Sequence, residues 1–174
     1  MNKILKIATV LTWINMIIWS FFCLNILFSI LSSGATAFLI LFVFCSAIVL
    51  HSYASLQLQK SLKNPAVPLS SQTSTGIRFI GVVALLLGLL FVIAGIIILT
   101  NATAVFKFLQ DYTKDAQPKA PSNEIGFTLT MSSVRIIGLC YLLIGLSVAI
   151  NVNLNFRLLR WYYFLRNNSN DREK

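Results

Sequence analysis

Residues 79–99 read FIGVVALLLGLLFVIAGIIIL, and this stretch decides the fold class. It contains no charged residue and almost no polar side-chain atom. A helix needs about 20 apolar residues, at about 1.5 Å each, to cross the hydrocarbon core of a bilayer. Unpaired backbone groups are costly in lipid, so a segment of this kind has to be helical. We therefore predict a transmembrane helix here.

Three other apolar runs reach a similar length, at residues 7–31, 37–58 and 136–156. The composition agrees with this pattern, because 57% of the residues are hydrophobic and only 11% are charged. A soluble chain of this size would carry far more charge. We predict an all-α integral membrane protein, in which residues 1–174 form a single membrane domain, a four-transmembrane-helix bundle.

Basic residues are unevenly distributed among the segments that flank these runs. Ten of the fourteen lysines and arginines lie in residues 1–6, 59–78 and 157–174, and the other four lie in or beside residues 101–134. The positive-inside rule therefore places both termini in the cytoplasm. It makes 59–78 a cytoplasmic loop, 157–174 a cytoplasmic tail and 101–134 an external segment. The plasma or inner membrane is the default location.

The first run has an alternative interpretation as a cleaved signal peptide, because Ala35-Thr36-Ala37 resembles a cleavage site. The apolar region of a signal peptide has about 7–15 residues, however, and this run is longer. Cleavage would also leave a chain that starts inside the second apolar run. We therefore interpret residues 7–31 as a membrane span, joined to the next span by a short outer turn at residues 32–36.

The second helix is predicted to continue through Lys63 and to end at Asn64-Pro65, since a residue before proline avoids the helical region. Ser and Thr residues in the connector that follows can cap the start of the third helix. A phosphorylated or partner-binding loop is the alternative for this connector.

The external segment contains apolar residues at spacings of three and four, which favour a short amphipathic helix. This helix would lie on the outer membrane surface or pack over the mouth of the bundle, as a structural cap or as a lid over a ligand. Pro118 and Pro121 would end it. The residues on its apolar face are Val105, Phe106, Phe108, Leu109 and Tyr112.

Small residues recur on one face of the third run and on one face of the fourth. Small side chains let helix backbones approach each other in lipid, so these two helices are predicted to pack closely. The residues 78–93 also align without gaps with residues 135–150, but the broken helices of transport repeats are missing, which favours convergent packing. The predicted packing residues are Gly81, Ala84, Gly88, Gly95, Gly138, Gly145 and Ala149.

Polar residues inside the runs are the candidates for a functional role. Asn15 is predicted to face the other helices and to hydrogen-bond there. His51, the sole histidine, is interpreted as a hydrogen-bonded residue near the interface, with a proton relay as the alternative. Asn151, Asn153 and Asn155 are predicted to be satisfied by water at the inner end of the fourth helix.

Arg135 marks the outer end of the fourth run, where its side chain is predicted to reach the headgroups. If the helix began near Asn123 instead, Arg135 would need a carboxylate from Glu124, Asp111, Asp115 or another protein. The tail mixes basic and aromatic residues directly after a span, which predicts lipid anchoring rather than nucleic-acid binding. The predicted anchoring residues are Arg157, Arg160, Trp161, Tyr162, Tyr163 and Arg166.

The chain lacks any evident catalytic constellation, and Cys23, Cys45 and Cys140 lie within spans without metal-ligand spacing. We therefore expect no enzyme activity, cofactor or metal. The leading hypothesis is a small non-catalytic membrane protein, an accessory or structural subunit of a membrane complex or a homo-oligomer. Its expected partners are membrane lipids and other membrane subunits or further copies of itself. The alternative is a small channel, carrier or lipid-handling protein, in which Asn15, His51 and the external segment line a path.

Overall fold

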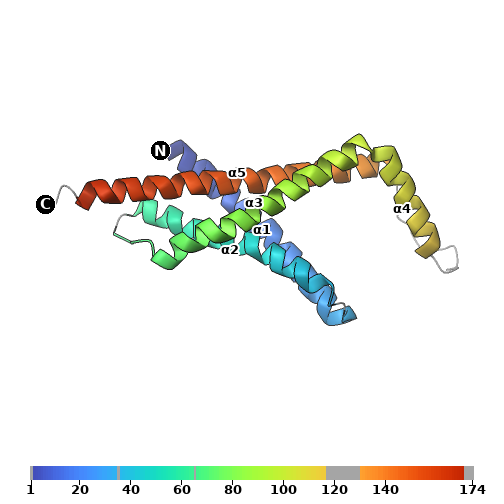
Figure 1. Ribbon diagram of the computed structural model, residues 1–174, viewed down its shortest axis with the longest axis horizontal. Coiled ribbons are helices and arrows are strands. Elements are labelled where there is room, and N and C mark those ends of the chain that lie inside the picture. Colours follow the sequence, from blue (N-terminus) through green and yellow to red (C-terminus); the bar gives the residue numbers. More distant parts are fainter. Residues whose placement is uncertain (1, 35, 65, 117–129, 171–174) are drawn as a thin grey trace. The chain divides into compact units, whose positions relative to one another are not determined.

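The structure is a computed structural model that describes residues 2–34, 36–64, 66–116 and 130–170. The described residues form five helices and no strand (Figure 1). The helices are α1 (Asn2–Ser33), α2 (Phe38–Lys63), α3 (Ser71–Thr100), α4 (Ala102–Ala116) and α5 (Met131–Asn170). Of these, α1, α2, α3 and α5 are long and apolar enough to cross a membrane. The predicted all-α class with four long apolar helices is confirmed.

The ends of α2 and α3 follow from local sequence. Helix α2 ends at Lys63, as predicted, because Asn64 before Pro65 has extended backbone angles (φ −127°, ψ 97°). Ser70 caps α3, since its Oγ accepts a hydrogen bond from the backbone N–H of Thr73 at 3.1 Å. Residues 71–78, predicted as part of the cytoplasmic connector, are helical as well.

The turn between α1 and α2 depends on Gly34. Its φ of +64° is left-handed, which glycine adopts without a steric cost. Its N–H donates to the carbonyl of Ile30 at 2.9 Å and closes the last turn of α1. Helices α1 and α2 then run antiparallel side by side (Figure 1).

The chain divides into two compact units. Residues 1–88 and 147–174 form the first unit, and residues 89–146 form the second. Helices α3 and α5 each continue from one unit into the other.

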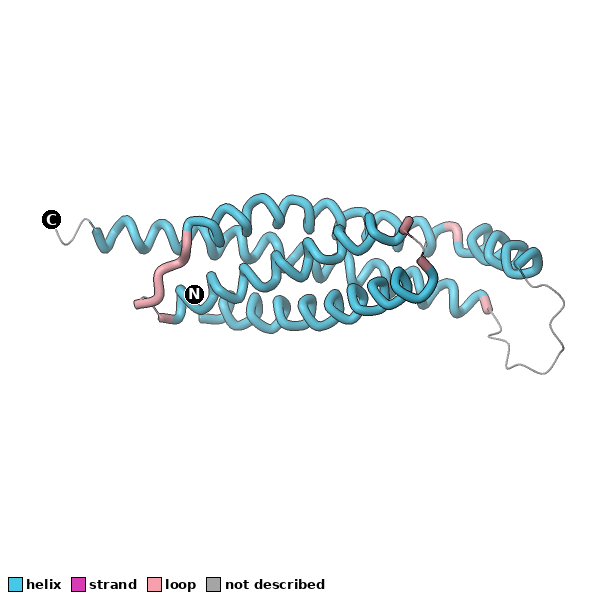
Figure 2. Tube along the Cα trace, turned by 90° about the horizontal axis from the view of Figure 1, so that it is seen from below, coloured by secondary structure: helices cyan, strands magenta, loops and turns pink. Residues whose placement is uncertain are grey.

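At one end of the first unit, the start of α1, the end of α2, the loop before α3 and the last part of α5 meet (Figure 2). They enclose a hydrophobic core that consists of Leu5, Ala8, Leu58, Leu69, Ile77, Leu158 and Leu159. The flanking basic residues therefore belong to the same end, which we call the basic end. Its described basic residues are Lys3, Lys6, Lys60, Lys63, Arg78, Arg157, Arg160 and Arg166.

The second unit holds the last part of α3 and the first part of α5 together with α4. Phe91 of α3 stacks on Tyr141 of α5, with ring centroids 5.2 Å apart. Helix α4 is the amphipathic helix that the spacing of apolar residues predicts, and Phe108 and Tyr112 of its apolar face are exposed. Pro118, Pro121 and the rest of residues 117–129 lie outside the described residues.

Candidate functional site

The most distinctive feature of the first unit is a cluster of buried polar side chains between α1, α2 and α5. On α5 the polar residues recur every fourth position, so they share one face over about 12 Å of helix. Residues of α2 that line the same interior recur in the same way, at His51, Ser55 and Gln59. We call the hydrogen-bonded members the polar cluster: Thr12, Asn15, Gln59, Ser147, Asn151 and Asn155.

Thr12 is the centre of this cluster, and it is fully buried. Its Oγ1 lies 2.8 Å from Oδ1 of Asn151, to which it can donate. The same oxygen accepts from Nε2 of Gln59 at 3.1 Å. Gln59 also donates to Oδ1 of Asn155 at 3.0 Å, and Asn155 donates to Oδ1 of Asn151 at 3.0 Å. One connected set of hydrogen bonds thus joins three helices.

Asn15 forms a second link between α1 and α5. Its Nδ2 donates to Oγ of Ser147 at 3.1 Å, and Oγ of Ser147 lies 3.3 Å from Oδ1 of Asn15, to which it can donate. Asn15 is 1% exposed, whereas Ser147 is half-buried. The structure thus places Asn15 at a contact between helices.

His51 of α2 has a fully buried side chain. Its ring meets Phe156 of α5 edge to face and approaches Gly81 of α3. Its Nε2 lies 3.4 Å from Oγ of Ser55. Within the described residues, three buried polar atoms of α2 have no hydrogen-bond partner: His51 Nδ1, Ser52 Oγ and Gln59 Oε1.

The small residues of α3 and α5 lie at buried positions, apart from the half-buried Ala149. In the first unit, a Cβ at Gly81 would meet the Phe156 ring at 2.7 Å. In the second unit, a Cβ at Gly95 would meet the backbone nitrogen of Leu142 at 2.6 Å, and one at Gly138 would meet Ile98 at 2.9 Å. Glycine at these positions permits close contact between helices.

The basic and aromatic residues of the tail are helical, and they have different surroundings. Arg157, Arg160 and Trp161 are exposed. Tyr162 and Tyr163 are half-buried, and they contact the loop before α3 and the start of α3. The Tyr162 hydroxyl accepts from the backbone N–H of Leu69 at 2.9 Å. The Tyr163 hydroxyl hydrogen-bonds with Oγ of Ser74. Tyr162 therefore holds the connector before α3 against α5, and Tyr163 holds the first turn of α3, in addition to any contact with lipid.

Two arginines that were predicted to contact lipid headgroups, Arg135 and Arg166, lie apart from the polar cluster. Arg135 is exposed, one turn after the start of α5 at Met131, and Arg166 is exposed near the end of the same helix. The position near Asn123, an alternative start for this helix, lies outside the described residues.

Sequence reasoning missed Gln59 and assigned Asn151 and Asn155 wrongly, to interface water. Both asparagines are buried, at 1% and 0% exposure, and bond within the bundle, while Asn153 is exposed. The usable signal was the spacing of four residues from Ser147 to Asn151 to Asn155, which puts all three on one helical face.

Comparison with models of protein families, with curated proteins and with solved structures yields no match. Within residues 2–34, 36–64, 66–116 and 130–170, no three His, Cys, Asp or Glu side chains gather as metal ligands would.

Proposed function

We propose that the chain is a small non-catalytic integral membrane protein, an accessory or structural subunit of a larger membrane complex or a homo-oligomer. The supporting observation is the polar cluster, whose members bond across α1, α2 and α5. Hydrogen bonds between helices hold a bundle together in lipid, where apolar burial supplies little driving force. The polar groups inside the spans thus serve the integrity of the bundle.

In this proposal both termini are cytoplasmic, in a plasma or inner membrane. The gathering of Lys3, Lys60 and Arg157 with other basic residues at the basic end supports this orientation, because loops rich in Lys and Arg stay on the cytoplasmic side. Membrane lipids contact the exposed apolar faces of the spans, and nucleic acid is not a partner.

The exposed apolar face of α4 is the surface that we propose for contact with a partner subunit. Phe108 and Tyr112 are 69% and 66% exposed there, on a helix outside the four candidate spans. An apolar face beyond the hydrocarbon region is covered either by the membrane surface or by another protein. This surface supports assembly as the proposed role.

A second candidate function is a small channel or carrier. The three unpaired polar atoms of α2, on His51, Ser52 and Gln59, favour it. Buried polar atoms without protein partners are commonly satisfied by internal water. A water-filled path past His51 and Asn15 would be its structural basis.

Native mass spectrometry after extraction in a mild detergent tests the proposal. We expect a stoichiometric membrane partner or a defined self-oligomer. Purified protein in liposomes loaded with the pH-sensitive dye pyranine tests the second candidate, and we expect no proton flux.

A lone monomer that conducts protons, and loses conduction in Asn15→Leu and His51→Leu, would overturn the proposal in favour of the channel. Asn25→Leu is the matched control, because Asn25 is exposed and donates to Phe21 O of its own helix at 2.8 Å.

A further inference from the structure

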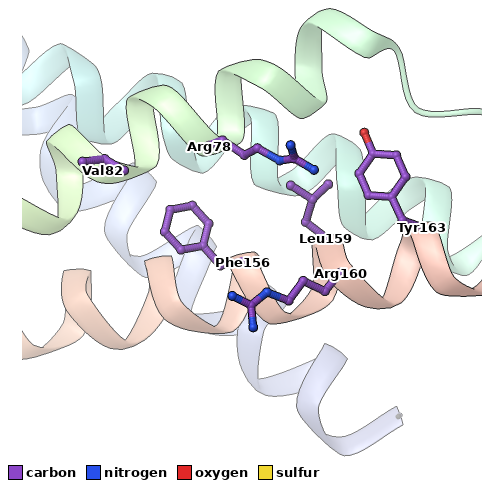
Figure 3. Close-up of a pocket in the computed structure, with 6 residues that line it drawn as sticks. All are labelled: Arg78, Val82, Phe156, Leu159, Arg160 and Tyr163. Carbon is purple, nitrogen blue, oxygen red and sulfur yellow. The ribbon is translucent and has the colours of Figure 1, made fainter.

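A pocket of about 600 Å³ opens between α3 and α5 at the basic end of the first unit (Figure 3). This volume is in the range of sites that hold small organic ligands, about 300–1,000 Å³. In Figure 3, Arg78 reaches from α3 toward Leu159 and Tyr163 of α5, while Arg160 lies along α5 beside Phe156. The residues that line the pocket are Arg78, Val82, Phe156, Leu159, Arg160 and Tyr163.

The two arginines give the pocket a positive charge, and no acidic side chain among the described residues of the first unit offsets it. Residues 1–88 and 147–170 contain no Asp or Glu at all. The face of the Tyr163 ring lies 5.5 Å from Cζ of Arg78, a cation–π contact that orients the guanidinium without neutralising it. The pocket is therefore suited to an anion.

Along both helices the pocket changes from charged to apolar. Val82 lies one turn after Arg78, inside the apolar run of α3, and Phe156 lies one turn before Arg160, at the end of the apolar run of α5. Four residues of helix correspond to about 6 Å. A ligand that fills the pocket would thus present an anionic group to the two arginines and an aliphatic group to Val82 and Phe156. This is the polarity profile of a phospholipid at the edge of the hydrocarbon core.

We propose that the pocket binds one anionic phospholipid, with its phosphate between Arg78 and Arg160 and the adjoining acyl chain against Val82 and Phe156. Guanidinium groups suit this role because their planar N–H groups match the geometry of phosphate oxygens. The site is distinct from general anchoring by the exposed tail, since it needs an arginine of α3 as well as one of α5. It is independent of whether the protein acts as a subunit or as a channel.

Lipid titration of the delipidated full-length protein, followed by native mass spectrometry, tests this site. We expect one bound phosphatidylglycerol, held at least about tenfold more tightly than phosphatidylcholine, whose choline cation is repelled by the arginines. Inorganic phosphate separates a lipid site from a phosphate site. We expect no displacement by equimolar phosphate, because the acyl chain contributes to binding.

Arg78→Gln and Arg160→Gln are each expected to weaken phosphatidylglycerol binding about tenfold, the effect of losing one charge-assisted hydrogen bond. Lys63→Gln is the matched control, because it removes an exposed positive charge of α2 at the basic end that does not line the pocket. We expect it to change affinity less than about twofold.

Val82→Trp tests the site without a change in charge, because the larger side chain fills the apolar part of the pocket. It should weaken lipid binding about tenfold, whereas Val43→Trp, at an exposed position of α2, should leave it unchanged. An equal loss in Lys63→Gln and the pocket variants would reduce the effect to general charge attraction and overturn the proposal. Equal affinity for phosphatidylcholine, or displacement by inorganic phosphate, would overturn it as well.

Discussion

At the scale of single residues, Thr12 connects α1 with both α2 and α5 through hydrogen bonds. Its hydroxyl has one proton, which it can donate to Oδ1 of Asn151 at 2.8 Å or to the Ala8 carbonyl at 2.7 Å. Its lone pairs accept from Gln59 and Asn155 at 3.1 and 3.4 Å. Valine has nearly the same shape but forms no hydrogen bond, so Thr12→Val would remove this connection with little change in packing.

We expect Thr12→Val to lower the free energy of unfolding by about 1–2 kcal/mol, because buried partners on α2 and α5 lose a hydrogen bond. Titration with SDS in mixed micelles measures this difference. Thr9→Val is the matched control, since the Thr9 hydroxyl donates to the Leu5 carbonyl of its own helix at 2.7 Å. The control should change stability by less than about 0.5 kcal/mol. Equal losses in the two variants would show that the contacts between helices contribute nothing.

Some residues of the polar cluster could be predicted from the sequence and others could not, for physical reasons. Asn15 could be predicted to bond with another helix, because an amide inside an apolar run needs a partner. Asn151 and Asn155 could not be separated from Asn153 by alternation alone, since helix geometry turns the first two inward and the third outward. Gln59 was missed because it lies just beyond the predicted span 37–58, where water is expected to satisfy polar groups.

At the scale of helices, the contact between α3 and α5 in the second unit depends on glycine. A Cβ at Gly95 would lie 2.6 Å from the backbone nitrogen of Leu142 and 2.9 Å from the carbonyl oxygen of Gly138. Both atoms belong to the backbone of α5, so neither can rotate away as a side chain could. An added methyl group would force the two helices apart.

We therefore expect Gly95→Ala to lower the free energy of unfolding by about 1–3 kcal/mol, the usual cost of overpacking. Alanine by itself favours a helix interior over glycine by about 1 kcal/mol. A net loss of stability would therefore mean that the steric effect is the larger one. Gly76→Ala in α3 is the control, because the nearest atom to its new Cβ is Ile80 Cδ1 at 4.0 Å. That variant should be as stable as the original or more stable. The same SDS titration distinguishes the two, and a stabilised Gly95→Ala would contradict the close contact.

Helix existence was easier to predict than helix length. Four apolar runs and one amphipathic stretch predict the five helices, and the residue before Pro65 predicts where α2 ends. The apolar run marks only the part of a helix that suits lipid, however, while backbone hydrogen bonding continues into polar flanks. This is why α3 starts at Ser71 rather than near residue 79, and why α5 continues to Asn170 rather than ending near residue 156.

At the scale of the whole molecule, positive charge is distributed unequally between the two ends of the candidate spans. The basic end gathers lysines and arginines from the start of α1, the end of α2, the start of α3 and the last part of α5. Such clustering is the expected result of the positive-inside rule when both termini lie on the cytoplasmic side. The proposed orientation and the proposed lipid site both rest on this arrangement.

Labelling with a membrane-impermeant thiol reagent tests this arrangement most directly. Single cysteines are introduced as Lys63→Cys and Lys114→Cys, in a chain whose Cys23, Cys45 and Cys140 are replaced by serine. In intact cells we expect labelling at position 114, with position 63 labelled only after the membrane is permeabilised. Labelling at position 63 with protection at position 114 would reverse the orientation. Labelling of both positions in intact cells would contradict the four-span arrangement itself.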